Sequence, residues 1–86
     1  MSLRVDFSHQ AAKDLRRLDR ITAKRVRARI EDLAADPFSH RLSRQIETMP
    51  GNRYTRVGDW RIIYQVDEAE GRLDIVSIRP RSAAYR

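Results

Sequence analysis

The stretch RYTRVGDWRIIYQV, residues 53–66, contains two alternating runs of residues separated by Gly58 and Asp59. A glycine followed by an aspartate between two such runs is a strong signal for a β-hairpin with a two-residue loop. A loop of this length also determines how the two strands pair. It predicts that Arg56 lies directly opposite Arg61 on the neighbouring strand.

The second strand of this hairpin has one apolar face, and we expect that face to lie under helices. It carries Trp60, Ile62, Tyr64 and Val66. Because side chains alternate along a strand, Arg61 points to the uncovered face, together with Arg56 and Tyr54. Like charges in directly opposed positions are destabilising, whereas paired guanidinium groups match phosphate oxygens bidentately. We therefore favour an anion-binding site over two solvated arginines that splay apart in water.

Two further strands flank the hairpin in sequence. Residues 72–78 (RLDIVSI) form the last strand, after a turn at residues 67–71. Residues 3–7 (LRVDF) alternate in the same way and form a short strand near the N-terminus. Residues 37–52 show no clear period, and we interpret them as a connection with one helical turn.

Helical spacing of apolar residues predicts two helices between the first strand and this connection. Ser8 is the predicted N-cap of the first helix, within residues 9–20, and Thr22 is the predicted cap of the second, within residues 23–36. Pro37 ends the second helix, since proline disfavours helical backbone in the residue before it. Only a few residues join the two helices, so we expect an antiparallel helical hairpin.

The predicted order of elements is β-α-α-β-β-β, in a single domain that spans residues 1–86. We expect an α+β fold in which a small twisted, mainly antiparallel four-stranded sheet has the N-terminal helical hairpin on one face. The second helix carries basic residues mostly away from its apolar stripe, which indicates a solvated face. These residues are Lys24, Arg25, Arg27 and Arg29.

The composition argues against several classes of protein. Hydrophobic residues make up 41% of the chain, enough for one small core, but no apolar run is long enough to span a membrane and no signal-peptide segment is recognisable. The absence of cysteine excludes disulfides and thiolate metal sites. His9 and His40 lie far apart in sequence without partners at metal-ligand spacing. We therefore expect a cytoplasmic protein with no metal and no cofactor.

The charge balance points to an anionic partner. The 18 basic residues outnumber the 12 acidic ones, giving a net charge of +6, and all but two of the basic residues are arginine. A GC-rich genome would explain that count equally well, so the positions of the arginines decide. The segment RPRSAAYR (residues 79–86) leaves the last strand beside the hairpin and can bring Arg79, Arg81 and Tyr85 to the surface that carries Arg61. There they would bind phosphate, with Tyr85 stacking on a base or bonding a hydroxyl.

These residues resemble a known family. The run YTRVGDWRIIYQV (residues 54–66), followed by a strand and by SIRPRSAAYR (residues 77–86), is similar to the RelE/ParE superfamily of bacterial and archaeal toxins. The resemblance covers nearly the whole chain and implies a toxin of a type II toxin–antitoxin pair. RelE-like members are ribosome-dependent endonucleases that cut mRNA in the ribosomal A site. Their RelB-like antitoxin wraps the toxin and blocks that surface. The resemblance therefore implies three partners, namely antitoxin, ribosome and mRNA, with no membrane and no small-molecule cofactor.

The resemblance also implies roles for individual residues. The family's hairpin arginine after the Gly-Asp turn corresponds to Arg61, and its basic residue before the turn corresponds to Arg56. The basic and aromatic positions of the family's C-terminal segment correspond to Arg79, Arg81 and Tyr85.

The chain also departs from the family pattern. RelE-like toxins often carry a second basic residue before the turn, where this chain has Tyr54 with Arg53 adjacent. Pro80 stands where a histidine is common, and Glu47 aligns with no catalytic glutamate.

Metal-free RNA cleavage uses the 2′-hydroxyl as nucleophile, and it needs a base and charge stabilisation. Arginine does not deprotonate in proteins, so Tyr85 is the candidate base or stacking platform, and Arg61 and Arg79 are the candidate catalytic charge stabilisers. Substrate positioning falls to a second set: Arg56, Arg81, Tyr54 and Arg53. Two alternatives stay open: a ParE-like inhibitor of DNA gyrase, and a non-catalytic module that binds RNA or antitoxin.

Overall fold

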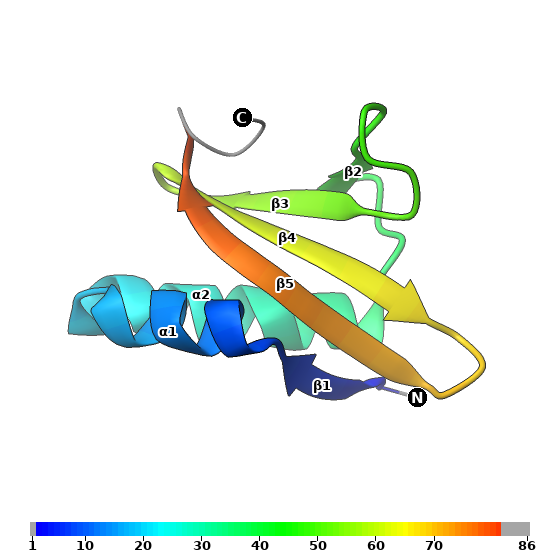
Figure 1. The fold of residues 1–86 in the computed structure, drawn as a ribbon, viewed down its shortest axis with the longest axis horizontal. Helices are drawn as coiled ribbons and strands as arrows, with labels where there is room; N and C mark the ends of the chain where they lie inside the picture. Colours follow the sequence, from blue (N-terminus) through cyan, green and yellow to red (C-terminus); the bar gives the residue numbers. More distant parts are fainter. Residues whose placement is uncertain (1, 82–86) are drawn as a thin grey trace.

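The computed structural model describes residues 2–81, and this part of the chain contains two helices and five strands. In chain order the elements are β1 (Arg4–Phe7), α1 (His9–Arg17), α2 (Arg20–Ala35), β2 (Ser43–Gln45), β3 (Arg53–Val57), β4 (Trp60–Asp67) and β5 (Arg72–Pro80). Figure 1 shows a twisted sheet with both helices on the same side of it. The predicted α+β class is confirmed, as is the order of both helices and of the four predicted strands.

The strands form one mixed sheet in the order β1-β5-β4-β3-β2. The N-terminal strand β1 lies parallel beside β5, and the other three pairs are antiparallel. Strand β4 is therefore central, and the first and the last strand of the chain are neighbours although most of the chain separates them (Figure 1).

The edge strand β2 lies in the segment that the sequence analysis interpreted as a connection, so the sheet has five strands instead of the predicted four. Ser43 pairs with Thr55 and Gln45 with Arg53, along the outer edge of β3. Three polar residues carry no alternation that could reveal a strand. The strand forms because its backbone N–H and C=O groups form hydrogen bonds with those at the edge of β3. Residues 37–42 form turns, and the backbone N–H of Ser43 donates a 3.0 Å hydrogen bond to the carbonyl of Ser39, which closes the one helical turn expected in this segment.

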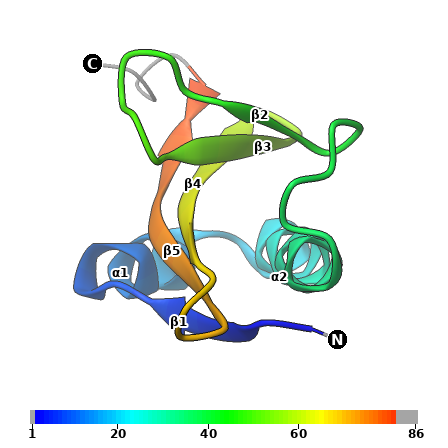
Figure 2. The ribbon, with the colours of Figure 1, turned by 90° about the vertical axis from the view of Figure 1, so that its right-hand side faces the viewer.

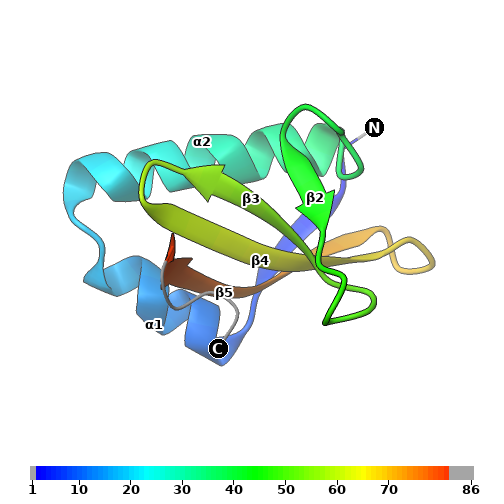
Figure 3. The same ribbon diagram turned by 90° about the horizontal axis from the view of Figure 1, so that it is seen from above.

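The two helices run antiparallel, as predicted, and lie apart from each other, α1 beside β5 and α2 beside β3 (Figures 2 and 3). Ser8 caps α1, and its Oγ accepts a hydrogen bond from the backbone N–H of Ala11. The cap of α2 is Asp19 and not Thr22, because the Asp19 carboxylate accepts the backbone N–H of Thr22. This hydrogen bond lowers the pKa of Asp19, and a carboxylate also suits the positive end of the helix dipole. Neither helix within residues 2–81 is long and apolar enough to cross a bilayer.

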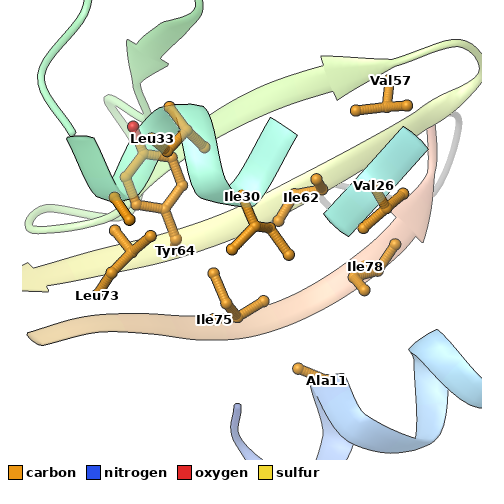
Figure 4. Packing of buried hydrophobic residues seen from close by; sticks show 11 residues of the cluster. Ala11, Val26, Ile30, Leu33, Val57, Ile62, Tyr64, Leu73, Ile75 and Ile78 are labelled. Atoms are coloured by element: carbon orange, nitrogen blue, oxygen red, sulfur yellow. The ribbon is translucent and has the colours of Figure 1, made fainter. Parts of the chain in front are cut away.

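The main core lies between the helices and the sheet (Figure 4). Tyr64 is fully buried in β4, and its hydroxyl donates a 2.7 Å hydrogen bond to the backbone carbonyl of Pro37. Both helices and strands β3 to β5 supply the rest of the core: Ala11, Val26, Ile30, Leu33, Ala34, Val57, Ile62, Leu73, Ile75 and Ile78. Trp60 and Val66 pack at its margin. The predicted apolar face of β4 is thus the face that the helices cover.

The hairpin between β3 and β4 has the predicted two-residue loop. Val57 pairs with Trp60 and Arg56 with Arg61. Gly58 has a φ of 58°, in the left-handed region that glycine adopts without steric cost. The loop therefore sets the register from which the site is built.

A β-bulge in β5 changes which of its residues face the core. Ile63 pairs with Ser77, but the next residue, Tyr64, pairs with Ile75. Val76 is therefore an extra residue in β5, and it reverses the alternation of side chains beyond it. Without the bulge, a core-facing Ile75 would imply that residue 79 also faces the core. With it, Ile78 faces the core and Arg79 does not.

Candidate functional site

Three arginines form a row across three neighbouring strands on the face of the sheet away from the helices. Arg56 of β3 pairs with Arg61 of β4, and Arg61 pairs on its other side with Arg79 of β5. The sequence analysis predicted the first pairing and expected Arg79 on the same surface. The bulge brings about the second pairing. We call these three residues the arginine row.

Arg61, in the middle of the row, is buried, and only 8% of it is exposed. Its guanidinium carbon lies 5.0 Å from the centre of the Tyr54 ring, in a cation–π contact. The sequence analysis expected an exposed arginine here, and that expectation was wrong. A central strand has neighbours on both sides, and the Tyr54 ring packs over the arginine. By contrast, Arg56 and Arg79 are exposed.

This burial has a chemical consequence. A side chain held by its surroundings loses little rotamer freedom when a ligand arrives, and a guanidinium shielded from water exerts a stronger field than a solvated one. The row therefore combines one preset charge with two exposed charges that can adjust to a ligand.

Arg81 is exposed and follows directly after β5. Its backbone N–H donates a 2.8 Å hydrogen bond to the carbonyl of Asp59, in the loop between β3 and β4. Arg81 is thus tied to the end of the sheet that carries the arginine row. Tyr85 lies outside the described residues, and its role stays a prediction.

Arg53, the remaining predicted substrate-binding residue, is not on this face. Its guanidinium donates to Ser43 Oγ and, at 3.3 Å, to the Tyr64 hydroxyl. It also lies 5.6 Å from the centre of the Phe38 ring. Because Arg53 pairs with Tyr64, it shares the helix side of the sheet with it. Its contacts are structural, and we leave it out of the proposed site.

The acidic residues of the same face lie toward the opposite end of the sheet. Arg72 forms ion pairs with Asp74 at 2.6 Å and with Asp67 at 3.2 Å. The hydrogen bond and charge of Asp74 raise the pKa of Arg72. Within residues 2–81 these are the only ion pairs. Among the described residues, no carboxylate forms an ion pair with Arg56 or Arg79, the two exposed arginines of the row.

One arginine beside the row was missed by sequence reasoning. Arg29 was expected on the solvated face of the second helix, but it is half-buried. Its NH1 donates to Thr55 Oγ1 at 2.8 Å and to the backbone carbonyl of Arg56 at 2.7 Å. It therefore joins α2 to β3 beside the row. Only the packing of α2 against β3 reveals this, because the helical pattern alone places Arg29 among solvated neighbours.

The described residues can bind a phosphate and stabilise developing negative charge. The arginines of the row supply no base, since arginine stays protonated. Within the described part of the chain, no three His, Asp or Glu side chains gather in a way that could hold a metal ion. The chemistry that these groups support is electrostatic.

Residues 5–85 match the family model described as ParE toxin of the type II toxin–antitoxin system parDE. Toxin RelE of Mycobacterium tuberculosis (strain ATCC 25618 / H37Rv) is 37% identical over 84 residues, which span 95% of this chain and 84% of that protein.

Solved structures of related toxins share the fold. The archaeal RelE–RelB complex from Pyrococcus horikoshii OT3 matches with a TM-score of 0.80 and 25% identity, over 98% of this chain and 100% of that one. The RelBE2 toxin–antitoxin complex of Mycobacterium tuberculosis matches with a TM-score of 0.79 and 24% identity, over 94% and 100% of the two chains. The isolated Escherichia coli RelE toxin has a TM-score of 0.83 at 16% identity, over 98% and 89%.

Proposed function

Because this chain belongs to the RelE/ParE superfamily of type II toxin–antitoxin toxins, we propose that it is a metal-independent endoribonuclease that cuts mRNA in the ribosomal A site. Its action inhibits translation, in the cytoplasm. The observation that carries this proposal is the arginine row, in which Arg56, Arg61 and Arg79 lie side by side on three neighbouring strands.

In the proposed reaction, the 2′-oxygen of one nucleotide attacks the adjacent phosphorus to form a 2′,3′-cyclic phosphate. The bond from this phosphorus to the 5′-oxygen of the next nucleotide breaks, and the leaving 5′-oxygen takes a proton from water. Arg61 and Arg79 stabilise the negative charge that builds up on the phosphoryl oxygens. Tyr85 accepts the proton of the 2′-hydroxyl, and the surrounding positive charge favours its phenolate. Arg56, Arg81 and the Tyr54 ring position the RNA. The ribosome supplies the in-line orientation that a shallow face cannot impose.

The proposed partner in the resting state is a RelB-like antitoxin. The related toxins from Pyrococcus horikoshii and Mycobacterium tuberculosis were solved as complexes with their antitoxins. An acidic and apolar antitoxin segment that orders on binding would cover the arginine row and exclude RNA from it. Added salt should weaken such a complex only in part, because the burial of apolar surface is not screened.

The proposal is tested with the purified toxin and ribosomes that carry a defined mRNA. We expect cleavage of the ribosome-bound mRNA and slow cleavage of the same RNA when free. Tyr85→Phe separates the two roles of the tyrosine, because it keeps the ring for stacking and removes the hydroxyl. Loss of cleavage in this variant supports a base, and full retention assigns Tyr85 to stacking.

A gyrase-directed activity is the competing function, since the matching family model is that of ParE toxins. Pulse labelling after induction distinguishes the two. We expect protein synthesis to fall before DNA synthesis. Earlier failure of DNA synthesis and supercoiling, with intact mRNA, would show that the gyrase-directed activity is the correct one.

A further inference from the structure

A second basic feature lies at the edge of the sheet, outside the arginine row. Strand β2 covers β3 only as far as Thr55, so the next residue, Arg56, extends past the start of β2. At this place a hollow of about 360 Å³ opens between α2, β2 and β3. Its lining includes four arginines and one aromatic residue: Arg29, Arg41, Arg44, Arg56 and Tyr54. We call it the edge hollow.

Two of its guanidinium groups are already held in place. Arg29 is held by its hydrogen bonds to Thr55 Oγ1 and to the carbonyl of Arg56. Arg44 donates to its own strand, at 2.9 Å to the carbonyl of Ser43, and also to the carbonyl of His40. Groups that are fixed before a ligand arrives lose less entropy on binding it.

The charge of the edge hollow is not neutralised by the described residues. No acidic side chain lines it, and the ion pairs within residues 2–81 all involve Arg72, which lies elsewhere. Four guanidinium groups around one hollow repel each other, and an anion that accepts hydrogen bonds from them relieves that repulsion.

Two residues connect the edge hollow with the arginine row. Arg56 lines the hollow and also pairs with Arg61 in the row. Tyr54 lines the hollow and its ring also lies over Arg61. A ligand whose negative charges repeat along a chain would therefore contact both features at once. RNA has such a backbone, and its bases can stack on an aromatic ring.

We propose that the edge hollow is a second phosphate subsite, which holds a phosphodiester group of RNA next to the phosphate bound by the arginine row. The inference rests on the proposed function, because it takes RNA as the ligand of the row. It adds Arg41 and Arg44 as residues that contact substrate, and it makes Arg29 a residue that shapes the subsite.

The test compares two double variants with equal loss of charge. Arg41→Ala/Arg44→Ala removes two exposed arginines from the hollow. Arg16→Ala/Arg27→Ala is the control, because both arginines are exposed on the helices and neither lines the hollow. The probe is a short 2′-O-methyl RNA oligonucleotide, which binds but cannot be cut. Its affinity is measured by fluorescence anisotropy over a series of salt concentrations.

We expect the hollow variant to bind this RNA about tenfold or more weakly than the control at low salt. The dependence of log K on log salt concentration should become shallower by about 0.7 for each lost phosphate contact. Equal affinity and equal slope for the two double variants would overturn the proposal. A poly-glutamate peptide is the second probe. If the hollow variant loses affinity for the peptide and keeps its affinity for RNA, the hollow serves an acidic protein segment instead.

The stability of each variant is measured separately, since the Arg44 side chain also donates hydrogen bonds to the backbone carbonyls of His40 and Ser43. Thermal melts of all variants show whether they fold, and Arg41→Ala alone should give a smaller loss of the same kind. Binding of the uncuttable RNA is independent of the cleavage reaction. A toxin that binds RNA through the hollow but cuts no ribosome-bound mRNA would refute the proposed function and leave this subsite standing.

Discussion

Arg61 and Arg79 are neighbours in the arginine row but differ in exposure. Substitutions at the two positions should therefore have similar effects on activity and different effects on stability. Replacing the exposed Arg79 with alanine removes a charge stabiliser and no core contact. We expect the rate of ribosome-dependent cleavage to fall by about 100- to 1,000-fold. The free energy of unfolding should change by less than about 1 kcal/mol. Thermal melts and cleavage assays on the same preparation check both values.

Arg61→Ala should lower cleavage by a similar factor and also lower the melting temperature. It removes a contact with the Tyr54 ring that is worth about 1 kcal/mol. In a domain of this size that corresponds to a shift of about 4–8 °C, offset in part by relief of repulsion with Arg56 and Arg79. Arg61→Lys is the matched control, since it keeps the charge and loses the planar fork. An Arg61→Ala protein that cuts at the wild-type rate would remove the row from the mechanism.

Sequence reasoning reached the pairing of Arg56 with Arg61 because a two-residue loop leaves one register for the hairpin. It did not predict the burial of Arg61. Burial depends on which way the Tyr54 ring turns and on the strands to either side, and neither is encoded in the local pattern. Arg53 was assigned to the site because it is adjacent to Tyr54 in sequence. Adjacent residues of a strand lie on opposite faces, so Arg53 lies on the helix side of the sheet and Tyr54 on the other side.

Side chains at the start of α1 and within it form hydrogen bonds with the backbone of strand β5 where β5 has no neighbouring strand on that side. Strand β1 pairs with β5 only as far as Ile75. Beyond that point, Ser8 Oγ donates to the carbonyl of Val76 at 2.7 Å, and Asp14 Oδ2 accepts the backbone N–H of Ile78 at 2.9 Å. These two side chains hold the bulge, and with it the strand segment that leads into Arg79.

Asp14→Ala should therefore affect activity as well as stability. The substitution leaves the buried N–H of Ile78 without its acceptor, at a cost of about 1–3 kcal/mol. It should also loosen the position of Arg79, so that cleavage decreases even at temperatures where the variant is fully folded. Asp14→Asn is the control, because its amide oxygen can still accept the same hydrogen bond. If Asp14→Ala is destabilised but cuts normally when folded, the link from α1 to the arginine row is absent.

At the level of elements, strong periodic patterns in the sequence were sufficient to predict helices and strands, and weak patterns were not. Both helices and strands β1, β4 and β5 have apolar periodicity that can be recognised in the sequence, and β3 was predicted as the other arm of the hairpin. Strand β2 has three polar residues and exists because the edge of β3 was available to it. The cap of α2 is Asp19, three residues before the predicted Thr22, and an ionised carboxylate is a good acceptor at a helix N-terminus.

Across the whole molecule, charge is segregated along one face of the sheet. The acidic residues Asp67 and Asp74 gather around Arg72 at one end, and the arginine row occupies the other. Together with the net charge of +6, this arrangement favours the binding of anions at the proposed site. An anion that binds only the folded state stabilises it by mass action.

Sulfate should therefore raise the melting temperature more than chloride does at equal ionic strength. Sulfate also stabilises proteins in general, so the informative quantity is the difference between wild type and Arg56→Ala/Arg79→Ala. We expect the sulfate-specific increase to be smaller in the variant. Equal increases in both proteins would mean that the arginine row does not bind the anion. The measurement is a set of thermal melts at matched ionic strength.

The fold as a whole was predictable because pattern, element order and family resemblance agreed on it. The edge hollow was not. It depends on where a three-residue strand stops and on an arginine that reaches across from α2, so no stretch of the sequence contains it.

The bulge at Val76 also determines which length changes this gene can accept. Ile75 and Ile78 both face the core although three positions separate them. Deleting Val76 would restore regular alternation, with Ile78 still facing the core and Arg79 still opposite Arg61. Inserting one residue between Ile78 and Arg79 would turn Arg79 toward the core, so a single added codon there would cost both the fold and the site. A codon lost from the turn between β4 and β5 would shift neither. Homologous toxins should therefore vary in length within their turns and at the bulge, and keep the residues that correspond to Ile78 and Arg79 adjacent.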